Sequence, residues 1–384
     1  MKQLKTNIYS LAFGGGGVGK VDGKVCFVGG ALPGEEVIFD VVRDTSSYIA
    51  GEVREILTAS PDRVKPECKY YGRCGGCQLQ HLAYDKELFY KKEQVVQLIA
   101  RISGIKDLEC CDITGSPDCY HYRSSVTLHK EKDVYGYYDM SGKHVLGIDE
   151  CSIAEGAINK SLAGLDKNGR EDVTLKADHN GKVWSSERMG ERFFFDRYGD
   201  MDICLSPKAF SQPNRYIAEM IVRTMEEWIG KPDENTVFFD IYCGAGFFSF
   251  LIKRDFSSRI GMDSSRVAID CAKNTAKNSK MGNIKFYKGD AEKDFFQVFE
   301  REKGPNNILL IDPPRTGVDK VFLENIGKNG DINRIFYISC DPSRLSRDIK
   351  ILTGESSWTL KKVKPFDMFP RTKHIETLAE FVRE

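Results

Sequence analysis

The sequence predicts an α/β protein with three parts: a small β-barrel, a mainly β middle segment and a carboxy-terminal, doubly wound parallel sheet. Three observations predict it. Between residues 7 and 58, short alternating runs are separated by glycines, as in a small barrel. From residue 212 onward, strand-like apolar runs alternate with segments of helical spacing, which indicates parallel strands joined by helices. The length of 384 residues exceeds what one hydrophobic core usually serves.

The barrel strands are expected at residues 25–28, 36–42 and 49–56. The glycine run at 14–17 could indicate a phosphate loop, but no Lys-Ser/Thr pair follows and no helix begins there. A hairpin turn is therefore the better interpretation. Prolines 61 and 66 mark a linker, so we expect domains at residues 1–60, 61–205 and 206–384.

The middle segment combines one helix with short strands. Residues 84–102 have helical spacing, and this helix is expected to pack on the carboxy-terminal domain. A second helix is expected near 154–162. The strands are expected at 124–129, 134–138, 173–177, 182–184 and 192–196.

The carboxy-terminal segment is expected to form a parallel sheet with helices between its strands. Its predicted helices cover residues 216–229, 247–256 and 267–279. Its predicted strands cover residues 237–241, 259–262, 284–287, 307–311 and 334–338.

The composition limits the classes of function. Lys plus Arg and Asp plus Glu number 56 each, so any nucleic-acid site must be local rather than a globally basic surface. No signal pattern and no membrane-length apolar stretch is present, so we expect a cytoplasmic protein without a membrane partner. The chain has 12 cysteines, and in that reducing setting clustered cysteines more often ligate metal than form disulfides.

A nucleotide-cofactor site is predicted at the turn DIYCGAG, from Asp240 through Tyr242, Gly244 and Gly246. Asp263 closes the next predicted strand, where a carboxylate could accept both ribose hydroxyls. Asp290 follows the third strand, where it could meet an adenine edge. Two phenylalanines replace the third glycine of a dinucleotide site, which favours S-adenosylmethionine over NAD. The alternative is an ordinary turn with strand-end caps.

Two polar segments follow apolar runs and should lie at the carboxyl edge of the sheet, where ligands bind. They are DPPR from Asp312 and SCD around Cys340. A cysteine at this edge is a candidate nucleophile. The alternative, a small buried hydrophobic residue, suits Cys243 and Cys271 better.

Five segments together resemble the RNA uracil-5 methyltransferase family: 210–214 (FSQPN), 240–246 (DIYCGAG), 312–317 (DPPRTG), 339–342 (SCDP) and 367–376 (DMFPRTKHIE). The resemblance implies a Rossmann-like class I methyltransferase domain that uses S-adenosylmethionine. Residues 27–35 (FVGGALPGE) resemble the turn of a TRAM domain, an OB-like RNA-binding barrel. Two departures are Asp263, where the family usually has glutamate, and Phe247, where it has a small or polar residue.

The family chemistry assigns roles to individual residues. Carbon 5 of uracil attacks a methyl sulfonium only after a thiolate adds to carbon 6, and Cys340 is expected to supply that thiolate. Glu376 is expected to remove the proton from carbon 5 afterwards. Gln212 and Asp312 could contact the cofactor or the uracil edge, and Phe210 could stack on a base.

Cys68, Cys74 and Cys77, with Cys151 as the fourth, resemble the [4Fe-4S] ligands of the family's 23S rRNA branch. Four thiolates also suit zinc, and the spacing alone does not separate the two. Cys110, Cys111 or Cys119 could instead supply the fourth ligand.

The leading hypothesis is therefore a monomeric RNA uracil-5 methyltransferase acting on 23S rRNA. The alternatives are a tRNA uridine-5 methyltransferase, a methyltransferase for nucleic-acid amino groups, and an RNA-binding iron–sulfur redox sensor without catalysis.

Overall fold

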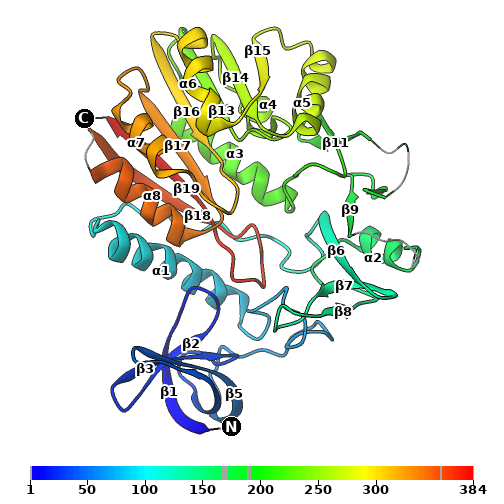
Figure 1. Ribbon diagram of the computed structural model, residues 1–384, viewed down its shortest axis with the longest axis vertical. Helices are drawn as coiled ribbons and strands as arrows, with labels where there is room; N and C mark the ends of the chain where they lie inside the picture. Colours follow the sequence, from blue (N-terminus) through cyan, green and yellow to red (C-terminus); the bar gives the residue numbers. More distant parts are fainter. Residues whose placement is uncertain (1, 167–171, 188–189, 191, 355–356, 384) are drawn as a thin grey trace.

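The computed structural model describes residues 2–166, 172–187, 190, 192–354 and 357–383. It contains a closed five-stranded barrel, a five-stranded middle sheet and a seven-stranded sheet with helices on both faces (Figure 1). Across these residues, no helix combines the length and apolar character needed to cross a membrane.

The barrel closes in the order β1-β2-β3-β5-β4. Alternate residues point inward because successive side chains of a strand face opposite sides, and Cys26, Val28 and Phe39 are fully buried there. The glycine run forms the turn between β1 and β2, which confirms the hairpin interpretation. The barrel strands are β1 (Gln3–Leu11), β2 (Gly17–Val21), β3 (Lys24–Gly29), β4 (Glu36–Asp44) and β5 (Tyr48–Thr58).

The middle segment begins with α1 (Tyr84–Ser103), which runs along the underside of the carboxy-terminal part in Figure 1. The antiparallel sheet follows in the order β10-β9-β6-β7-β8, and the short α2 (Gly156–Leu162) packs on one of its faces. The sheet strands are β6 (Ser125–Glu131), β7 (Val134–Tyr138), β8 (Val145–Gly147), β9 (Val173–Ala177) and β10 (Val183–Ser185).

A separate hairpin, β11 (Phe194–Tyr198) and β12 (Met201–Leu205), ends this segment. Its apolar side chains join the core of the carboxy-terminal part, where β12 packs on α5 (Arg266–Ser279). The expected domain boundary at residue 205 therefore separates this hairpin from the residues that it packs against.

The carboxy-terminal sheet has the order β15-β14-β13-β16-β17-β19-β18. Its first five strands are parallel, whereas β19 is antiparallel to both β17 and β18. The five strands that the sequence predicts are β13 to β17, and their parallel arrangement is confirmed, whereas β18 and β19 are not among the predicted strands. Only a loop joins β18 to β19, and a parallel neighbour would need a crossover helix. The strands are β13 (Thr236–Ile241), β14 (Ser258–Asp263), β15 (Ile284–Lys288), β16 (Asn306–Ile311), β17 (Arg334–Ser339), β18 (Trp358–Phe366) and β19 (Glu376–Arg383).

The helices cover both faces of this sheet. They include α3 (Arg215–Ile229), α4 (Phe247–Leu251), α6 (Ala291–Glu302), α7 (Lys320–Lys328) and α8 (Pro342–Gly354). The helix expected at 247–256 stops at Leu251. The Arg259 guanidinium donates to the carbonyls of Ser249, Ile252 and Arg254 at 2.7–2.9 Å, so these groups are satisfied without a longer helix.

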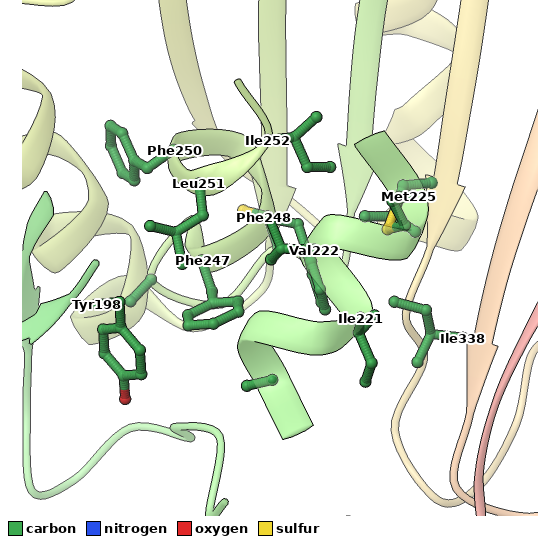
Figure 2. Packing of buried hydrophobic residues seen from close by; sticks show 14 of the residues in the cluster. Tyr198, Ile221, Val222, Met225, Phe247, Phe248, Phe250, Leu251, Ile252 and Ile338 are labelled. Atoms are coloured by element: carbon green, nitrogen blue, oxygen red, sulfur yellow. The ribbon is translucent and has the colours of Figure 1, made fainter. Parts of the chain in front are cut away.

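Aromatic side chains from α4 anchor the start of the domain. Phe247 and Phe248 pack between Ile221 and Val222 of α3 and Tyr198 of the hairpin (Figure 2). The Phe247 and Tyr198 rings meet edge to face with their centroids 4.9 Å apart. Phe247 thus belongs to the core, and this packing holds the preceding glycine turn in place.

Candidate active site

The turn between β13 and α4 has a left-handed backbone at three positions: Tyr242 (φ 64°), Gly244 (φ 55°) and Gly246 (φ 81°). The two glycines serve different purposes. A Cβ on Gly246 would lie 2.8 Å from the rings of Phe250 and Phe286, whereas a Cβ on Gly244 would meet nothing within 4 Å. Gly246 is therefore needed for core packing, and Gly244 lies on open space.

Two of the carboxylates in the predicted cofactor site hold this turn. Asp263 accepts the backbone N–H groups of Gly244 (2.9 Å) and Ser265 (2.7 Å). Asp240 is completely buried and accepts both the N–H and the hydroxyl of Ser249. Burial raises the pKa of Asp240 to about 7. Asp240 supports the turn from beneath.

Asp290 has a capping role in the structure. Its carboxylate accepts the N–H of Glu292 at the start of α6 and pairs with Lys293 at 3.0 Å. It does not border the cavity described next, but the N–H of Gly289 just before it donates to the Asp263 carbonyl at 3.1 Å, and its contact with a cofactor stays a prediction.

A cavity of about 850 Å³ opens at the carboxyl edge of the sheet. It joins most of the candidate residues from three separate parts of the chain. Asp240, Gly246 and Asp290 lie outside its lining. The candidates that border it are Phe210, Gln212, Tyr242, Gly244, Asp263, Asp312, Cys340, Glu376 and the four cysteines Cys68, Cys74, Cys77 and Cys151.

Strand pairing brings Cys340 and Glu376 together. The register of β17 and β19 places Ser339 opposite Thr377, so Cys340 and Glu376 are neighbours at the next position. Asp312 directly follows the adjacent strand β16, and Arg315 comes three residues later. The four side chains border one end of the cavity.

The electrostatics of this end favour protonated groups. Burial raises the pKa of Glu376 to about 7, against the lowering effect of Arg315. Burial and the Glu376 carboxylate raise the pKa of Cys340 to about 12, and Arg315 opposes them. Burial and Glu376 also hold the pKa of Asp312 well above its usual range. Cys340 is therefore a thiol at neutral pH until its proton is taken up, while Glu376 titrates near neutrality.

The segment that carries Phe210 and Gln212 crosses the cavity between the middle sheet and α3. The Ser124 hydroxyl donates to the carbonyls of Gln212 (3.4 Å) and Pro213 (3.2 Å), and Lys176 donates to the carbonyl of Ala209. The Phe210 side chain is 66% exposed at the cavity, which leaves its ring available for stacking.

All 12 cysteines are free. Burial, with smaller contributions from the charges of Cys151, Cys74 and Cys68, raises the pKa of the Cys77 thiol to about 12, and all four cysteines border the cavity. Four cysteine thiols suit an iron–sulfur cluster or zinc chemically. Within the residues that the structure describes, however, no three His, Cys, Asp or Glu side chains form a group placed to hold a metal ion.

The alternative fourth ligands lie elsewhere. Cys110 and Cys111 run beside Val363 of β18. Cys119 accepts a hydrogen bond from Arg371 at 3.1 Å. Of the four candidates for the fourth ligand, Cys151 borders the cavity together with Cys68, Cys74 and Cys77, whereas Cys110, Cys111 and Cys119 do not.

The loop from β18 to β19, which leads to Glu376, is held by residues that sequence reasoning missed. The N–H groups of Gln78 and Leu79, just after Cys77, donate to the Arg371 carbonyl at 3.1 and 3.0 Å. A buried cluster of Glu87, Lys91, Asp367 and Arg371 ties the same loop to α1. Only the Glu87–Lys91 spacing within one helix gives a sequence signal.

Comparisons with known proteins agree with this geometry. Residues 200–382 match the family described as tRNA (uracil-5-)-methyltransferase. An uncharacterized RNA methyltransferase of Aquifex aeolicus is 30% identical over 426 residues, covering 98% of each chain. One of Clostridium tetani is 29% identical over 448 residues, covering 98% of this chain and 96% of the relative.

Among solved structures, Pyrococcus abyssi tRNA (uracil-54, C5)-methyltransferase in complex with S-adenosyl-L-homocysteine superimposes with a TM-score of 0.73. The match covers 99% of this chain and 100% of that one at 21% identity. At this identity, the likeness establishes the fold.

Proposed function

The chain belongs to the RNA uracil-5 methyltransferase family, and we propose that it methylates carbon 5 of a uridine in RNA through a covalent bond between Cys340 and carbon 6 of the base. The observation that carries the proposal is the pairing of β17 with β19. It makes a candidate nucleophile and a candidate base neighbours at the rim of one cavity.

The chemistry follows from the positions of these groups. The Cys340 thiol loses its proton to solvent and its sulfur bonds to carbon 6, and the electron pair of the 5,6 double bond makes carbon 5 nucleophilic. S-adenosylmethionine, when bound, supplies the methyl group. The Glu376 carboxylate then takes the proton from carbon 5, the double bond re-forms, and the Cys340 thiolate leaves. A pKa of about 7 suits Glu376 to this role near neutral pH.

The cofactor-binding residues in this proposal are those that border the cavity. Gly244 leaves space for close approach of a ligand to the backbone, and Asp263 lies beside it at the end of β14. Tyr242, Gln212 and Asp312 complete the set. Phe210 and Asp312 would contact the target uracil.

We further propose 23S rRNA as the substrate and a [4Fe-4S] cluster, with zinc as the alternative, on Cys68, Cys74, Cys77 and Cys151. The four free thiols that border one cavity support this proposal, as does the resemblance of their spacing to the family's rRNA branch. The barrel would bind RNA as a TRAM domain. Because one chain supplies all the catalytic candidates, the enzyme is proposed to act as a monomer. A tRNA substrate is the alternative, since the matched family description names tRNA.

Release of tritium from RNA labelled at carbon 5 of uracil tests the function. The protein should release tritium only with S-adenosylmethionine present, and Cys340→Ala should release none. An amino-group methyltransferase would methylate RNA without releasing tritium, and an RNA-binding redox sensor would do neither. Comparing unmodified 23S rRNA with unmodified tRNA transcripts in the same assay distinguishes the two substrates.

A further inference from the structure

The middle sheet has two chemically different faces. Val126 and Leu128 of β6 and Val173 and Leu175 of β9 are buried in the core under α2. The intervening residues of the same strands point the other way and border the cavity. They are Ser125, Thr127 and His129 of β6 and Thr174 and Lys176 of β9.

The register arranges this polar face in rows. Ser125 lies opposite Lys176, and Thr127 lies opposite Thr174, with their hydroxyl oxygens 3.0 Å apart. His129 follows and contacts Asp172 at 2.7 Å. A half-buried antiparallel sheet commonly turns its polar face to water. Here that face is instead a wall of the cavity that contains Cys340.

Lys176 is an unusual residue for such a wall. Its side chain is only 2% exposed, and its ammonium donates to the carbonyl of Ala209. None of the carboxylates in the described parts of the chain forms an ion pair with it, and burial lowers its pKa to about 8. An ammonium has three N–H donors, and a buried cation is normally paired with an anion. The site therefore favours an anionic ligand.

Two further cations border the same part of the cavity. The Arg123 Nε donates to the carbonyl of Ser125, directly opposite Lys176, at 2.9 Å. Lys208 also borders the cavity, one residue before Ala209, whose carbonyl accepts the hydrogen bond from Lys176. Three cations thus border this polar face. The carboxylates of the cavity lining are Glu150, Asp263, which holds the glycine turn, and Asp312 and Glu376, which lie beside Cys340. Phosphate groups of RNA fit this combination of cations and hydroxyls.

We propose that the polar face of β6 and β9 binds the sugar-phosphate backbone of single-stranded RNA next to the target uridine, with Lys176 as a buried phosphate contact. The proposal rests on RNA being the substrate. Lys176 donates to the carbonyl of Ala209, next to the exposed Phe210 ring, and Ser125 of the middle sheet lies opposite it; Cys271 of α5 is also close enough to interact with its charge. The carboxylate of S-adenosylmethionine is the other anion that such a cation could hold.

The test is the salt dependence of RNA binding. Fluorescence anisotropy with a labelled oligouridylate would be measured at graded KCl concentrations for the full chain, Lys176→Met and Lys176→Arg. Losing one phosphate contact to a single strand lowers the slope of log K against log salt by about 0.7. Lys176→Met should show this loss, and Lys176→Arg should retain the slope. Lys160→Met, on the exposed end of α2 outside the cavity, is the matched control and should change nothing.

A second variant tests the face without altering its charge. Thr127→Val combined with Thr174→Val keeps residues that suit strands but removes the hydroxyls, so it should weaken oligouridylate binding with an unchanged salt slope. Unchanged affinity in this variant would overturn the proposal, even if Lys176→Met did not fold.

Two other results for Lys176→Met would also overturn it. An unchanged slope with weaker S-adenosylhomocysteine binding in calorimetry would assign Lys176 to the cofactor carboxylate. An unchanged slope with a lower melting temperature alone would make Lys176 a structural clamp on Ala209. Since oligouridylate binding needs no methyl transfer, a protein that released no tritium but showed the slope change would refute the proposed function and support this inference.

Discussion

Lys91→Met should destabilise the protein by about 3–5 kcal/mol, the usual cost of removing one partner from a buried ion pair. The Lys91 ammonium is 1% exposed and lies 2.7 Å from both Glu87 Oε1 and Asp367 Oδ1. Methionine has a similar shape but leaves two fully buried carboxylates without this cation. Arg371 remains only near Glu87, at 3.4 Å.

The neighbouring lysine provides a matched control. Lys92 lies on the same helix and pairs with Asp112, whose side chain is 95% exposed. Lys92→Met should therefore cost only about 0–1 kcal/mol, as for other surface pairs. Urea unfolding of both variants gives the free energies. Adding Asp367→Asn to Lys91→Met should recover part of the loss, because Asp367 then carries no charge while Glu87 keeps its contact with Arg371.

The pH dependence gives a second measure of the same effect. Burial already raises the pKa of Glu87 to about 7, and loss of Lys91 should raise it further. A carboxyl with a higher pKa in the folded protein destabilises the fold most above that pKa and ceases to do so below its unfolded value. The deficit of Lys91→Met should thus shrink as the pH falls from the higher pKa of Glu87 in the variant towards about 7, where Glu87 of the unmodified protein also takes up its proton. A loss no larger than that of Lys92→Met, or one independent of pH, would refute the reasoning.

Three further predictions concern the site. Gly246→Ala should destabilise the protein by about 1–3 kcal/mol more than Gly244→Ala in urea unfolding. Both positions have positive φ, but only a Cβ at position 246 would meet the rings of Phe250 and Phe286. Equal losses for the two variants would contradict this reasoning. Tritium release under saturating substrate should rise with pH to a plateau above about 7, as Glu376 ionises, and a flat profile would exclude Glu376 as the limiting base. Cys74→Ser should lower the iron and sulfide content of anaerobically purified protein. Cys119→Ser should not, because Cys119 binds Arg371 instead. Stoichiometric zinc in a colourless protein would contradict the iron–sulfur cluster.

The sequence predicts those features of the site that depend on local pattern. Apolar runs that end at Asp312 and Cys340 indicate strands, and parallel strands bring their carboxyl ends to one edge. The glycine turn is predictable for the same reason. Spacing alone does not predict hydrogen-bond partners: Asp240 binds Ser249, and Asp290 caps α6, although both occupy positions expected for cofactor contacts.

The features that the sequence does not predict depend on pairing between residues far apart in the chain. The antiparallel register that sets Glu376 beside Cys340 depends on the short β18–β19 connection, and Lys91 meets Asp367 across most of the chain. A lysine in a strand such as β9 is expected on a solvated face. Lys176 is buried because the segment around Ala209 passes over it, and no local sequence pattern predicts that contact.

The most direct test of the covalent mechanism uses Glu376→Gln. The glutamine cannot take the proton from carbon 5, so the Cys340–RNA bond should persist after methyl transfer. With labelled RNA and S-adenosylmethionine, denaturing electrophoresis should show a protein–RNA adduct for Glu376→Gln and none for Cys340→Ala combined with Glu376→Gln. Full turnover by Glu376→Gln without an adduct, or methylation by Cys340→Ala at an unchanged rate, would contradict the mechanism.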